Sequence, residues 1–542
     1  MRRVALKSIV FLSFFVAISA QAADQSKLKL NKKSKLNQYI VVYKEDSAAK
    51  SGKSKKFKSL ESRRGRANLH AGQHGLTVKK VFGKAINGFV VEGNLDDIKE
   101  LSKRDDIEYI EQDAEVFLDS NQVGAPWGLD RIDQRSKTLN GIYSYDRAGT
   151  GVNVYVVDSG IRMTHDDFGT RASNGWDFDT TNNGDDCFGH GTHVAGTIGG
   201  TTYGVAKSVD LIAVRVFDCV GGSTISRVID GFDWVAGNAQ LPAVLNASLG
   251  VLGGSTSVDN AVQGVIDAGV TVVVSAGNSG ADACNQSPAR LKDAITVGAT
   301  DQNDMRRSTS NYGQCVDVWA PGENILSADE DSDTGTETLS GTSMAAPHMA
   351  GIAALYLQGA PNAAVQSVVK AIMGKVTTNR VGDRKTIDTP NLLAYSKGTA
   401  GEYAVLHRYY NKGATDHFYT TNWWELQSAP NSDWAYEGPL GYVQTKDFNG
   451  SSPLYRYNHA SSKDHFYTTN YSSLGIGHSG WVYEGVTGYL PPASSSTKDV
   501  YRYYNQSAGD HLYSTNWNAL GSGNSSWLYE GVTGQVFTLP QD

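Results

Sequence analysis

The chain has 542 residues, of which 40% are hydrophobic and 19% charged, so it can hold about three domains with packed cores. This composition excludes a short peptide hormone and a purely disordered regulator. Residues 1–120 contain 23 Lys and Arg against 15 Asp and Glu, a net charge of +8, and residues 121–542 carry −15. The acidic main part argues against nucleic acid as a partner, because phosphate contacts require clustered lysine and arginine.

Residues 1–22 have the features of a secretory signal peptide. Basic residues at positions 2, 3 and 7 precede a mostly apolar run at 9–18, and Ala20 and Ala22 form a small-residue cleavage site. The run is too short to span about 30 Å of hydrocarbon, so we predict a soluble, secreted protein. The four cysteines lie between positions 187 and 315 and fit an oxidising compartment. Their spacing alone leaves three possible pairings open.

Residues 23–121 are basic and predict a small α+β unit. Strands mixed with a helix over about 80 residues are typical of one compact domain. The basic stretches are 27–35 and 50–66, the strand-like runs are 39–43, 88–91 and 107–110, and the helix candidate is 95–103.

Residues 122–398 predict an α/β fold. Unbroken β-branched strands that alternate with helices are typical of a doubly wound, mostly parallel sheet covered on both faces. The apolar runs are 152–157, 211–217 and 270–274, and the helix-like patterns are 193–198, 225–236, 258–268 and 343–357. Residues 396–401 follow, and their composition predicts a flexible linker.

Residues 402–542 contain three repeats and predict an all-β, β-trefoil-like domain with a pseudo-threefold axis. The segment 401–542 holds six of the ten tryptophans and 17 of the 27 tyrosines. These aromatic rings are suited either to stacking on a carbohydrate or cell-surface ligand or to forming the core, which is the commoner role for any single ring. The recurring motifs start at Leu406, Leu454 and Val500, at Asp416, Asp464 and Asp510, and at Trp434, Trp481 and Trp527.

Three segments each place one reactive side chain among small residues: Asp158 in Val-Val-Asp-Ser-Gly, His190 in Gly-His-Gly-Thr-His, and Ser343 in Gly-Thr-Ser-Met-Ala. Alone, each residue type is also common in caps, turns or cores. Together they supply a hydroxyl nucleophile, an imidazole to take its proton and a carboxylate to orient that imidazole. Asn278, after the run 270–274, offers an amide for an oxyanion or, alternatively, is a turn residue.

The order Asp, His, Ser, with these segments and Ala-Gly-Asn at 276–278, resembles the subtilisin-like serine proteases over residues 122–398. The resemblance implies that Asp158 is the orienting acid, His190 the general base, Ser343 the nucleophile and Asn278 the oxyanion donor. It implies a secreted serine endopeptidase of broad specificity that acts on proteins or peptides. The rival interpretation is a binding protein or adhesin with this fold as an inactive scaffold, and the intact set of four residues argues against it.

The segment 126–134 and the cysteine positions resemble the proteinase K branch, and within it the aqualysin-like secreted bacterial proteases. This resemblance implies the disulfides Cys187–Cys219 and Cys284–Cys315. It also implies that a peptide substrate adds as a strand beside two uncharged segments. These segments are Gly221, Gly222 and Ser223, and Ser248, Leu249 and Gly250.

The same resemblance implies structural Ca²⁺, which prefers carboxylate and carbonyl oxygens. The first implied site consists of Asp317 and the carbonyls of Lys292 and Ala294. The second consists of Asp130, Asp133 and Gln134, and is weakened because Asn140 stands where an acid is expected. The alternative is that these are ordinary surface acids on an acidic domain.

Residues 23–121 resemble the ferredoxin-like inhibitory propeptide of this family. The resemblance implies that this segment inhibits the enzyme within the same chain and is released by self-cleavage between Leu118 and Val123. Its positive charge is complementary to the acidic enzyme.

Overall fold

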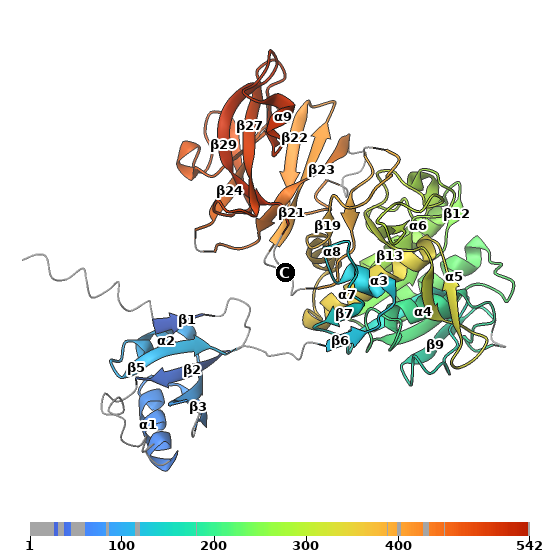
Figure 1. Cartoon of the computed structure of the whole chain (residues 1–542), viewed down its shortest axis with the longest axis horizontal. Helices are drawn as coiled ribbons and strands as arrows, with labels where there is room; N and C mark the ends of the chain where they lie inside the picture. The colour runs from blue at the N-terminus through green and yellow to red at the C-terminus, as the bar shows by residue number, and fades with distance from the viewer. Residues whose placement is uncertain are drawn as a thin grey trace, which may run out of the picture. The chain divides into compact units, whose positions relative to one another are not determined.

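A computed structural model describes residues 27–30, 37–44, 60–82, 86–113, 120–179, 182–386, 388–397, 403–426, 433–448 and 450–539. The predicted signal peptide (1–22) and residues 398–401 of the predicted linker lie outside these ranges. The chain divides into two compact units, Met1–Leu118 and Asp119–Asp542 (Figure 1). Within the described residues, no helix is long and apolar enough to cross a membrane.

The described part of the first unit is a five-stranded sheet with two helices, and the predicted small α+β unit is confirmed. Its strand order is β1-β5-β2-β4-β3, and β2 pairs antiparallel with β4 and β5. Helix α2 begins where the Asn94 side chain accepts a hydrogen bond from the Asp97 backbone. Helix α1 covers part of the predicted basic stretch 50–66 and buries Ala67 and Ala71 against the sheet. The elements are β1 (Leu28–Lys29), β2 (Gln38–Tyr43), α1 (Leu60–Gly72), β3 (Thr77–Val81), β4 (Gly88–Glu92), α2 (Leu95–Ser102) and β5 (Ile107–Gln112).

The part of the second unit at residues 120–397, here called the sheet domain, is built on a nine-stranded sheet. All its neighbouring pairs are parallel except β19 with β20. Every residue of β11, β13 and β15 is buried, and since alternate residues face opposite sides, both faces of the sheet are covered. The predicted α/β fold is confirmed. In spatial order the strands are β19 (Thr377–Thr378), β20 (Leu392–Leu393), β16 (Val318–Pro321), β15 (Ile295–Thr300), β13 (Thr271–Ser275), β11 (Ala243–Ala247), β8 (Asn153–Asp158), β10 (Asp210–Arg215) and β9 (Ala172–Asp177).

Four helices of the sheet domain, α4 to α7, begin at polar caps or at glycines. Thr224 and Ser255 cap α5 and α6 through their side chains, whereas α4 and α7 begin after Gly189 and Gly341. The helices are α3 (Trp127–Ile132), α4 (His190–Gly199), α5 (Ile225–Asn238), α6 (Thr256–Asp267), α7 (Thr342–Gly359) and α8 (Val365–Met373). Short strand pairs are β6 (Ser120–Val123) with β7 (Ile142–Tyr145), β12 (Val251–Leu252) with β14 (Gln286–Ser287), and β17 (Ile325–Ala328) with β18 (Thr336–Leu339).

Residues 403–539, here called the tail, form three similar antiparallel units of three strands each, drawn from orange to red in Figure 1. The predicted all-β region with three repeats is confirmed, and its likeness to a β-trefoil stays a prediction. The strands are β21 (Tyr403–Asn411), β22 (Asp416–Thr420) and β23 (Trp434–Gln444), then β24 (Ser452–His459), β25 (Asp464–Thr468) and β26 (Trp481–Leu490), then β27 (Thr497–Asn505), β28 (Asp510–Ser514) and β29 (Leu528–Phe537), with the short helix α9 (Trp517–Leu520).

The three repeats are locked together by a closed ring of tyrosines. The Tyr419 hydroxyl donates to the carbonyl of Tyr513, that of Tyr513 to the carbonyl of Tyr467, and that of Tyr467 to the carbonyl of Tyr419. Each hydroxyl also accepts the backbone N–H of another ring member. These fully buried rings therefore serve as the core of the tail, one of the two predicted roles.

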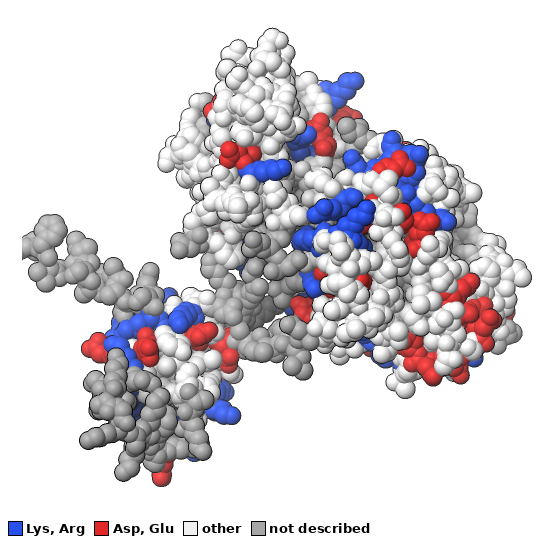
Figure 2. Space-filling view, viewed as in Figure 1, with Lys and Arg blue, Asp and Glu red and all other residues white. Residues whose placement is uncertain are grey.

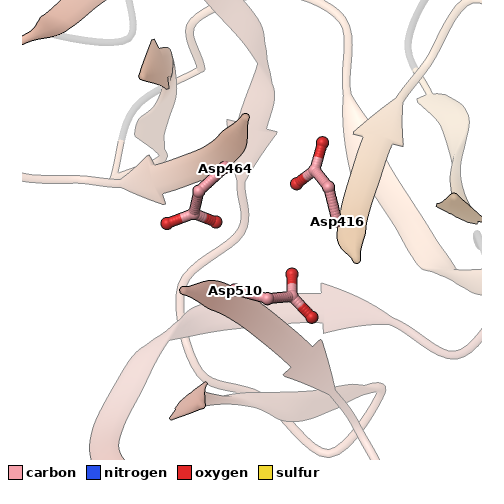
Figure 3. A group of neighbouring side chains, drawn as sticks. All are labelled: Asp416, Asp464 and Asp510. Carbon is pink, nitrogen blue, oxygen red and sulfur yellow. The ribbon is translucent and has the colours of Figure 1, made fainter. Parts of the chain in front are cut away.

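Beside this ring, the carboxylates of Asp416, Asp464 and Asp510 approach one another within 4.8 Å (Figure 3). Each carboxylate accepts the backbone N–H of a histidine in another repeat and bonds its Nδ1. Both oxygens of each aspartate are therefore engaged between repeats, which gives this buried acidic group a structural role.

One hydrophobic core continues from the sheet domain into the first repeat. Trp423 and Tyr442 belong to the same buried cluster as the strands and helix α7 of the sheet domain. The Tyr442 hydroxyl donates to the carbonyl of Val376 (2.8 Å) and accepts the N–H of Thr378 in β19 (3.0 Å). The sequence predicts a flexible linker at 396–401 and a domain of its own after it, but these contacts make the first repeat part of the same compact unit as the sheet domain.

Candidate active site

Asp158 is the last residue of β8, at the carboxyl end of the parallel sheet. Its side chain is 1% exposed, and its Oδ1 accepts the N–H of Ser159 at 2.8 Å. Ligand sites in open α/β sheets form at this edge, where strands end and loops begin. The sequence therefore places a buried carboxylate where a site is expected.

His190 opens helix α4, and its Nδ1 lies 2.7 Å from Asp158 Oδ1. The first turn of α4 can pack against Gly160 because position 191 is glycine, where a Cβ would collide with the carbonyl oxygen of Gly160. Burial favours the neutral imidazole, but the charge and hydrogen bond of Asp158 outweigh burial and raise the pKa of His190 above its ordinary value. The Nδ1 contact leaves the other ring nitrogen, Nε2, to act on a proton.

Ser343 is the second residue of helix α7. Its hydroxyl lies 3.4 Å from the carbonyl oxygen of Ser248, and the Ser248 hydroxyl donates to the carbonyl of Ser343 at 2.9 Å. Asn246 in turn donates to the Ser248 hydroxyl at 3.0 Å. The predicted substrate segment 248–250 is thus tied to the predicted nucleophile.

Asn278 lies beside the start of α7. Its Oδ1 accepts the N–H of Thr342 at 2.9 Å, so the amide is oriented with its Nδ2 group as the remaining donor. This contact fixes Asn278 next to Ser343, as an oxyanion donor would require.

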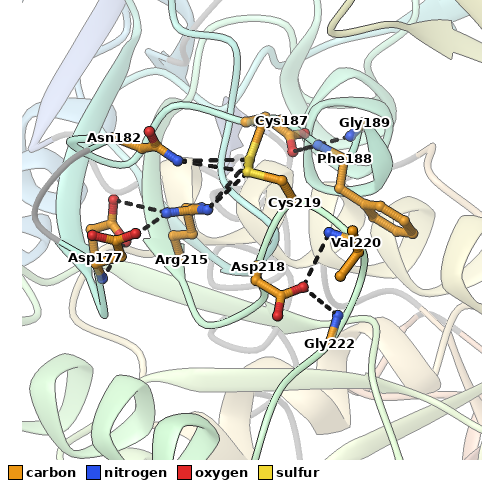
Figure 4. Close-up of a disulfide and its surroundings, with 12 residues drawn as sticks. Asp177, Asn182, Cys187, Phe188, Gly189, Arg215, Asp218, Cys219, Val220 and Gly222 are labelled. Carbon is orange, nitrogen blue, oxygen red and sulfur yellow. Dashed lines mark hydrogen bonds and ion pairs between the residues drawn. A yellow bond between two sulfur atoms is a disulfide. The ribbon is translucent and has the colours of Figure 1, made fainter.

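The second predicted substrate segment, Gly221 to Ser223, is a tight turn beside a disulfide (Figure 4). The Asp218 carboxylate accepts the N–H of Gly222 at 2.7 Å. Gly221 has a φ of +76° and faces the Phe188 ring, which leaves no space for a Cβ. The turn therefore explains these glycines without excluding contact with a substrate.

The cysteines pair as the resemblance implies, Cys187 with Cys219 and Cys284 with Cys315. The first disulfide joins the loop before His190 to the loop that contains Gly221. Arg215, which is 1% exposed and paired with Asp177, places its Nη2 3.3 Å from the Cys187 sulfur (Figure 4). The disulfide thus fixes two loops that flank the candidate site.

The surroundings of Asp317 do not fit the first implied calcium site. Oδ2 accepts the N–H of Thr296 at 2.7 Å, and Oδ1 accepts the indole N–H of Trp423 in the tail at 2.9 Å. Asp317 is 4% exposed, and burial raises the pKa of its carboxyl to about 7. An N–H donor therefore points at an oxygen that the ion would need.

The second implied calcium site fits in part. Asp130 uses both oxygens to accept the N–H groups of Asn140 and Gly141. Oδ2 of Asp133 accepts the N–H of Ser144 and lies 3.4 Å from Lys397 Nζ. The buried Oδ1 of Asp133 has no hydrogen-bond partner among the described residues. Gln134 donates to the carbonyls of Ser136 and Thr138. Among the carboxylate oxygens of Asp130 and Asp133, Asp133 Oδ1 is the one without a donor from the described residues, so it is the most open to an ion.

Sequence reasoning did not identify Trp423 and Lys397 as neighbours of these carboxylates. Both lie far along the chain from their partners, and Trp423 sits at a position that is aromatic in every repeat. A repeated aromatic position indicates a shared role within the repeats, so it gives no signal for a contact that one repeat makes with another domain.

Comparisons with known proteins match most of both units. The model of the subtilase family matches residues 149–396, and that of peptidase inhibitor I9 matches residues 38–119. A domain of unknown function, DUF5648, matches residues 392–475 and 473–541.

The chain is 48% identical to the extracellular serine proteinase of Thermus sp. (strain Rt41A) over 366 residues, 66% of this chain and 89% of that protein. It is 46% identical to alkaline serine exoprotease A of Vibrio alginolyticus over 367 residues, 66% of this chain and 67% of that protein. The crystal structure of a cold-adapted subtilisin-like serine proteinase is 50% identical and covers 51% of this chain and 99% of that chain, with a TM-score of 0.49.

Proposed function

Because the chain belongs to the subtilase family of serine peptidases and carries a peptidase inhibitor I9 propeptide, we propose that it is a secreted endopeptidase that uses Asp158, His190 and Ser343. The observation that carries this assignment is the 2.7 Å contact between Asp158 Oδ1 and His190 Nδ1. It fixes one ring nitrogen of His190 and leaves Nε2 as the base for a serine hydroxyl.

In the proposed reaction, His190 Nε2 takes the Ser343 hydroxyl proton as Oγ attacks the carbonyl carbon of the scissile peptide bond. The carbonyl oxygen becomes an anion, to which Asn278 Nδ2 donates. When the C–N bond breaks, His190 returns the proton to the leaving amine and an acyl-enzyme remains. Water then attacks the ester through the same steps and restores Ser343.

Hydrolysis of casein by the purified chain tests this function. A serine-directed phosphonylating or sulfonylating reagent should stop hydrolysis and transfer its phosphonyl or sulfonyl group to Ser343 Oγ, with loss of the leaving group of the reagent and the hydroxyl proton. Modification at another serine, or hydrolysis that continues after complete labelling of Ser343, would contradict the assignment.

Asn278→Ala should lower kcat by about 10²–10³-fold with little change in KM, because the amide donates chiefly to the developing oxyanion. This is the size of the loss measured for the corresponding asparagine of subtilisin, a member of the same family. Asn278→Asp, which keeps the acceptor for Thr342 but lacks the NH₂ group, separates the donor role from loop anchoring. Equal activity of wild type and Asn278→Asp would remove Asn278 from the oxyanion site.

For a structural Ca²⁺, we propose Asp133 as the carboxylate ligand, with Asp130 and Gln134 beside it. The support is the buried Oδ1 of Asp133, which no donor of the described residues contacts, an acceptor whose burial is unfavourable unless a cation or donor meets it. Ca²⁺ bound there would stabilise the fold by binding the native state preferentially.

For the tail, we propose a second function, binding of a neutral carbohydrate through the second and third repeats. Tyr471 and Trp517 are 38% and 40% exposed, and each packs against two tyrosines of its own repeat, Tyr455 and Tyr483 or Tyr501 and Tyr529. The tail face visible in Figure 2 has few charged side chains. Partly exposed aromatic rings are suited to stacking on sugar rings.

The double variant Tyr471→Ala/Trp517→Ala should therefore lower retention on insoluble polysaccharide particles several-fold, since each lost ring contact costs about 0.5–1.5 kcal/mol. Binding is measured with inhibitor-blocked enzyme so that proteolysis does not alter the bound fraction. The matched control is Ile476→Ala, an apolar residue that is 85% exposed and outside both ring clusters. Equal losses in the control and the double variant would contradict a role for the ring clusters.

A further inference from the structure

We propose that the first repeat of the tail is a built-in occupant of the Asp317 site, so that a docked tail and a divalent cation at Asp317 exclude one another. The contact that carries this inference is the 2.9 Å hydrogen bond from the Trp423 indole N–H to Asp317 Oδ1. The indole is 1% exposed and the aspartate 4% exposed. A buried carboxylate needs donors or a cation at both oxygens, and the tail supplies the second donor.

The docking is built from several buried contacts. Tyr442, also fully buried, bonds the main chain of Val376 and Thr378. The guanidinium of Arg135 lies 5.4 Å from the centre of the Tyr442 ring and donates to its hydroxyl. The first repeat and the sheet domain also share one hydrophobic core. Movement of Trp423 away from Asp317 would therefore expose apolar surface to water. This exposure is unfavourable, so the docked state is favoured.

The other repeats show that this role is special to Trp423. The position follows the sequence Thr-Thr-Asn in the first two repeats and Ser-Thr-Asn in the third, and it holds Tyr471 and Trp517 in the second and third. Those two side chains are 38% and 40% exposed. The same position is thus a surface position in two repeats and a buried hydrogen-bond donor in the repeat that covers Asp317.

While the tail is docked, the space around Asp317 offers a cation few further oxygen ligands. A cavity of about 80 Å³ remains there, lined by Lys292 and Gln314 of the sheet domain and by Tyr409 and Tyr436 of the tail. The Tyr409 hydroxyl already donates to the Trp423 carbonyl, and the Tyr436 hydroxyl lies 3.3 Å from His407 Nδ1. Ca²⁺ needs six to eight oxygen ligands, and the tail wall presents aromatic rings in their place.

Mutual exclusion has a direct thermodynamic consequence. A ligand stabilises only the state that it binds. Ca²⁺ at Asp317 would therefore favour the undocked tail, and docking of the tail would lower the affinity of Asp317 for Ca²⁺. In the docked chain, Asp317 contributes to the stability of the fold through its hydrogen bond with Trp423. Ca²⁺ bound at Asp317 contributes to stability only when the indole is removed.

The test is the number of Ca²⁺ ions bound by the full-length chain, measured by isothermal titration calorimetry in the Ser343→Ala background to prevent autolysis. We expect Asp317→Asn to leave the number unchanged and Trp423→Ala to raise it by one. Asp317→Asn in the Trp423→Ala chain should abolish the additional ion, and the calcium-dependent rise in Tm should be larger in Trp423→Ala than in that double variant.

Trp517→Ala is the matched control, since it removes the equivalent side chain of the third repeat and should leave the ion count unchanged. Trp423→Leu keeps an apolar side chain and replaces Trp423→Ala if the latter does not fold. The loss of one ion in Asp317→Asn alone would show that Ca²⁺ binds beside the docked tail and would overturn the proposal. No additional ion in a folded Trp423 variant would equally overturn it, because Asp317 would then not be a cation site at all.

Discussion

Replacing Ser343 by alanine is expected to abolish peptidase activity and to leave the precursor uncut. No other atom can form the acyl-enzyme if Ser343 Oγ is the nucleophile, and the same atom is expected to cleave the propeptide. The loss in kcat should be about 10⁶-fold, the size measured for the corresponding serine of subtilisin, a member of the same family. The exposed Ser332 provides the matched control, Ser332→Ala.

The measurement is the mass and N-terminus of the chain produced in a host without other secreted proteases. The wild-type chain should lose its propeptide at a bond near the boundary between the two compact units, Leu118 and Asp119. A bond before β6 is favoured, because β6 pairs with β7 from Ser120 onward and cleavage inside it would break that pairing. Propeptide release at the normal rate in Ser343→Ala would refute self-cleavage.

Asp158→Asn should lower kcat by about 10⁴-fold, the loss found for this replacement in a serine protease of another fold. An amide preserves the size of the side chain but cannot stabilise the imidazolium that forms when His190 takes a proton. It can also hold the imidazole in the wrong tautomer, with the proton on the nitrogen that should act as the base.

The pH profile provides a second readout of Asp158→Asn. His190 must be neutral to act as a base, so activity is lost as the pH falls through its pKa. Asp158 raises that pKa above the ordinary value of 6.5, so the acid limb of wild-type kcat/KM should lie above pH 6.5. In Asp158→Asn the limb should move to lower pH. An unshifted limb would show that Asp158 does not set the pKa of His190.

The sequence was sufficient to predict the mostly parallel sheet and the strand end at which Asp158 lies. A β-branched run that ends in Asp158 is typical of a buried strand with a polar end, and the structure ends β8 there. The predicted helix 193–198 begins three residues earlier in the structure, at His190. Its first turn contains Gly191, and a glycine weakens the helical pattern of the sequence at that point. The structure requires this glycine because the turn packs closely on Gly160.

The polar strand β9 and the docking of the tail could not be predicted in the same way. β9 contains Ser173, Asn174 and Gly175, and its place at the sheet edge comes from pairing with β10 and not from its own pattern. The contact between Trp423 and Asp317 joins residues 106 positions apart in the chain. No local periodicity encodes such a contact, so the Asp317 carboxylate had no visible partner in the sequence except an ion.

Because Tyr419, Tyr467 and Tyr513 form a closed ring, the structure of the first repeat depends on a part of the chain that is synthesised much later. The Tyr419 hydroxyl donates to the carbonyl of Tyr513, and His417 Nδ1 bonds the Asp510 carboxylate. Tyr513 and Asp510 each follow their partner by more than 90 residues, so they leave the ribosome well after the first repeat. A premature stop codon or a proteolytic cut before Asp510 would therefore leave the ring open. The damage would then reach the sheet domain through Trp423, although it arose far along the chain from Asp317.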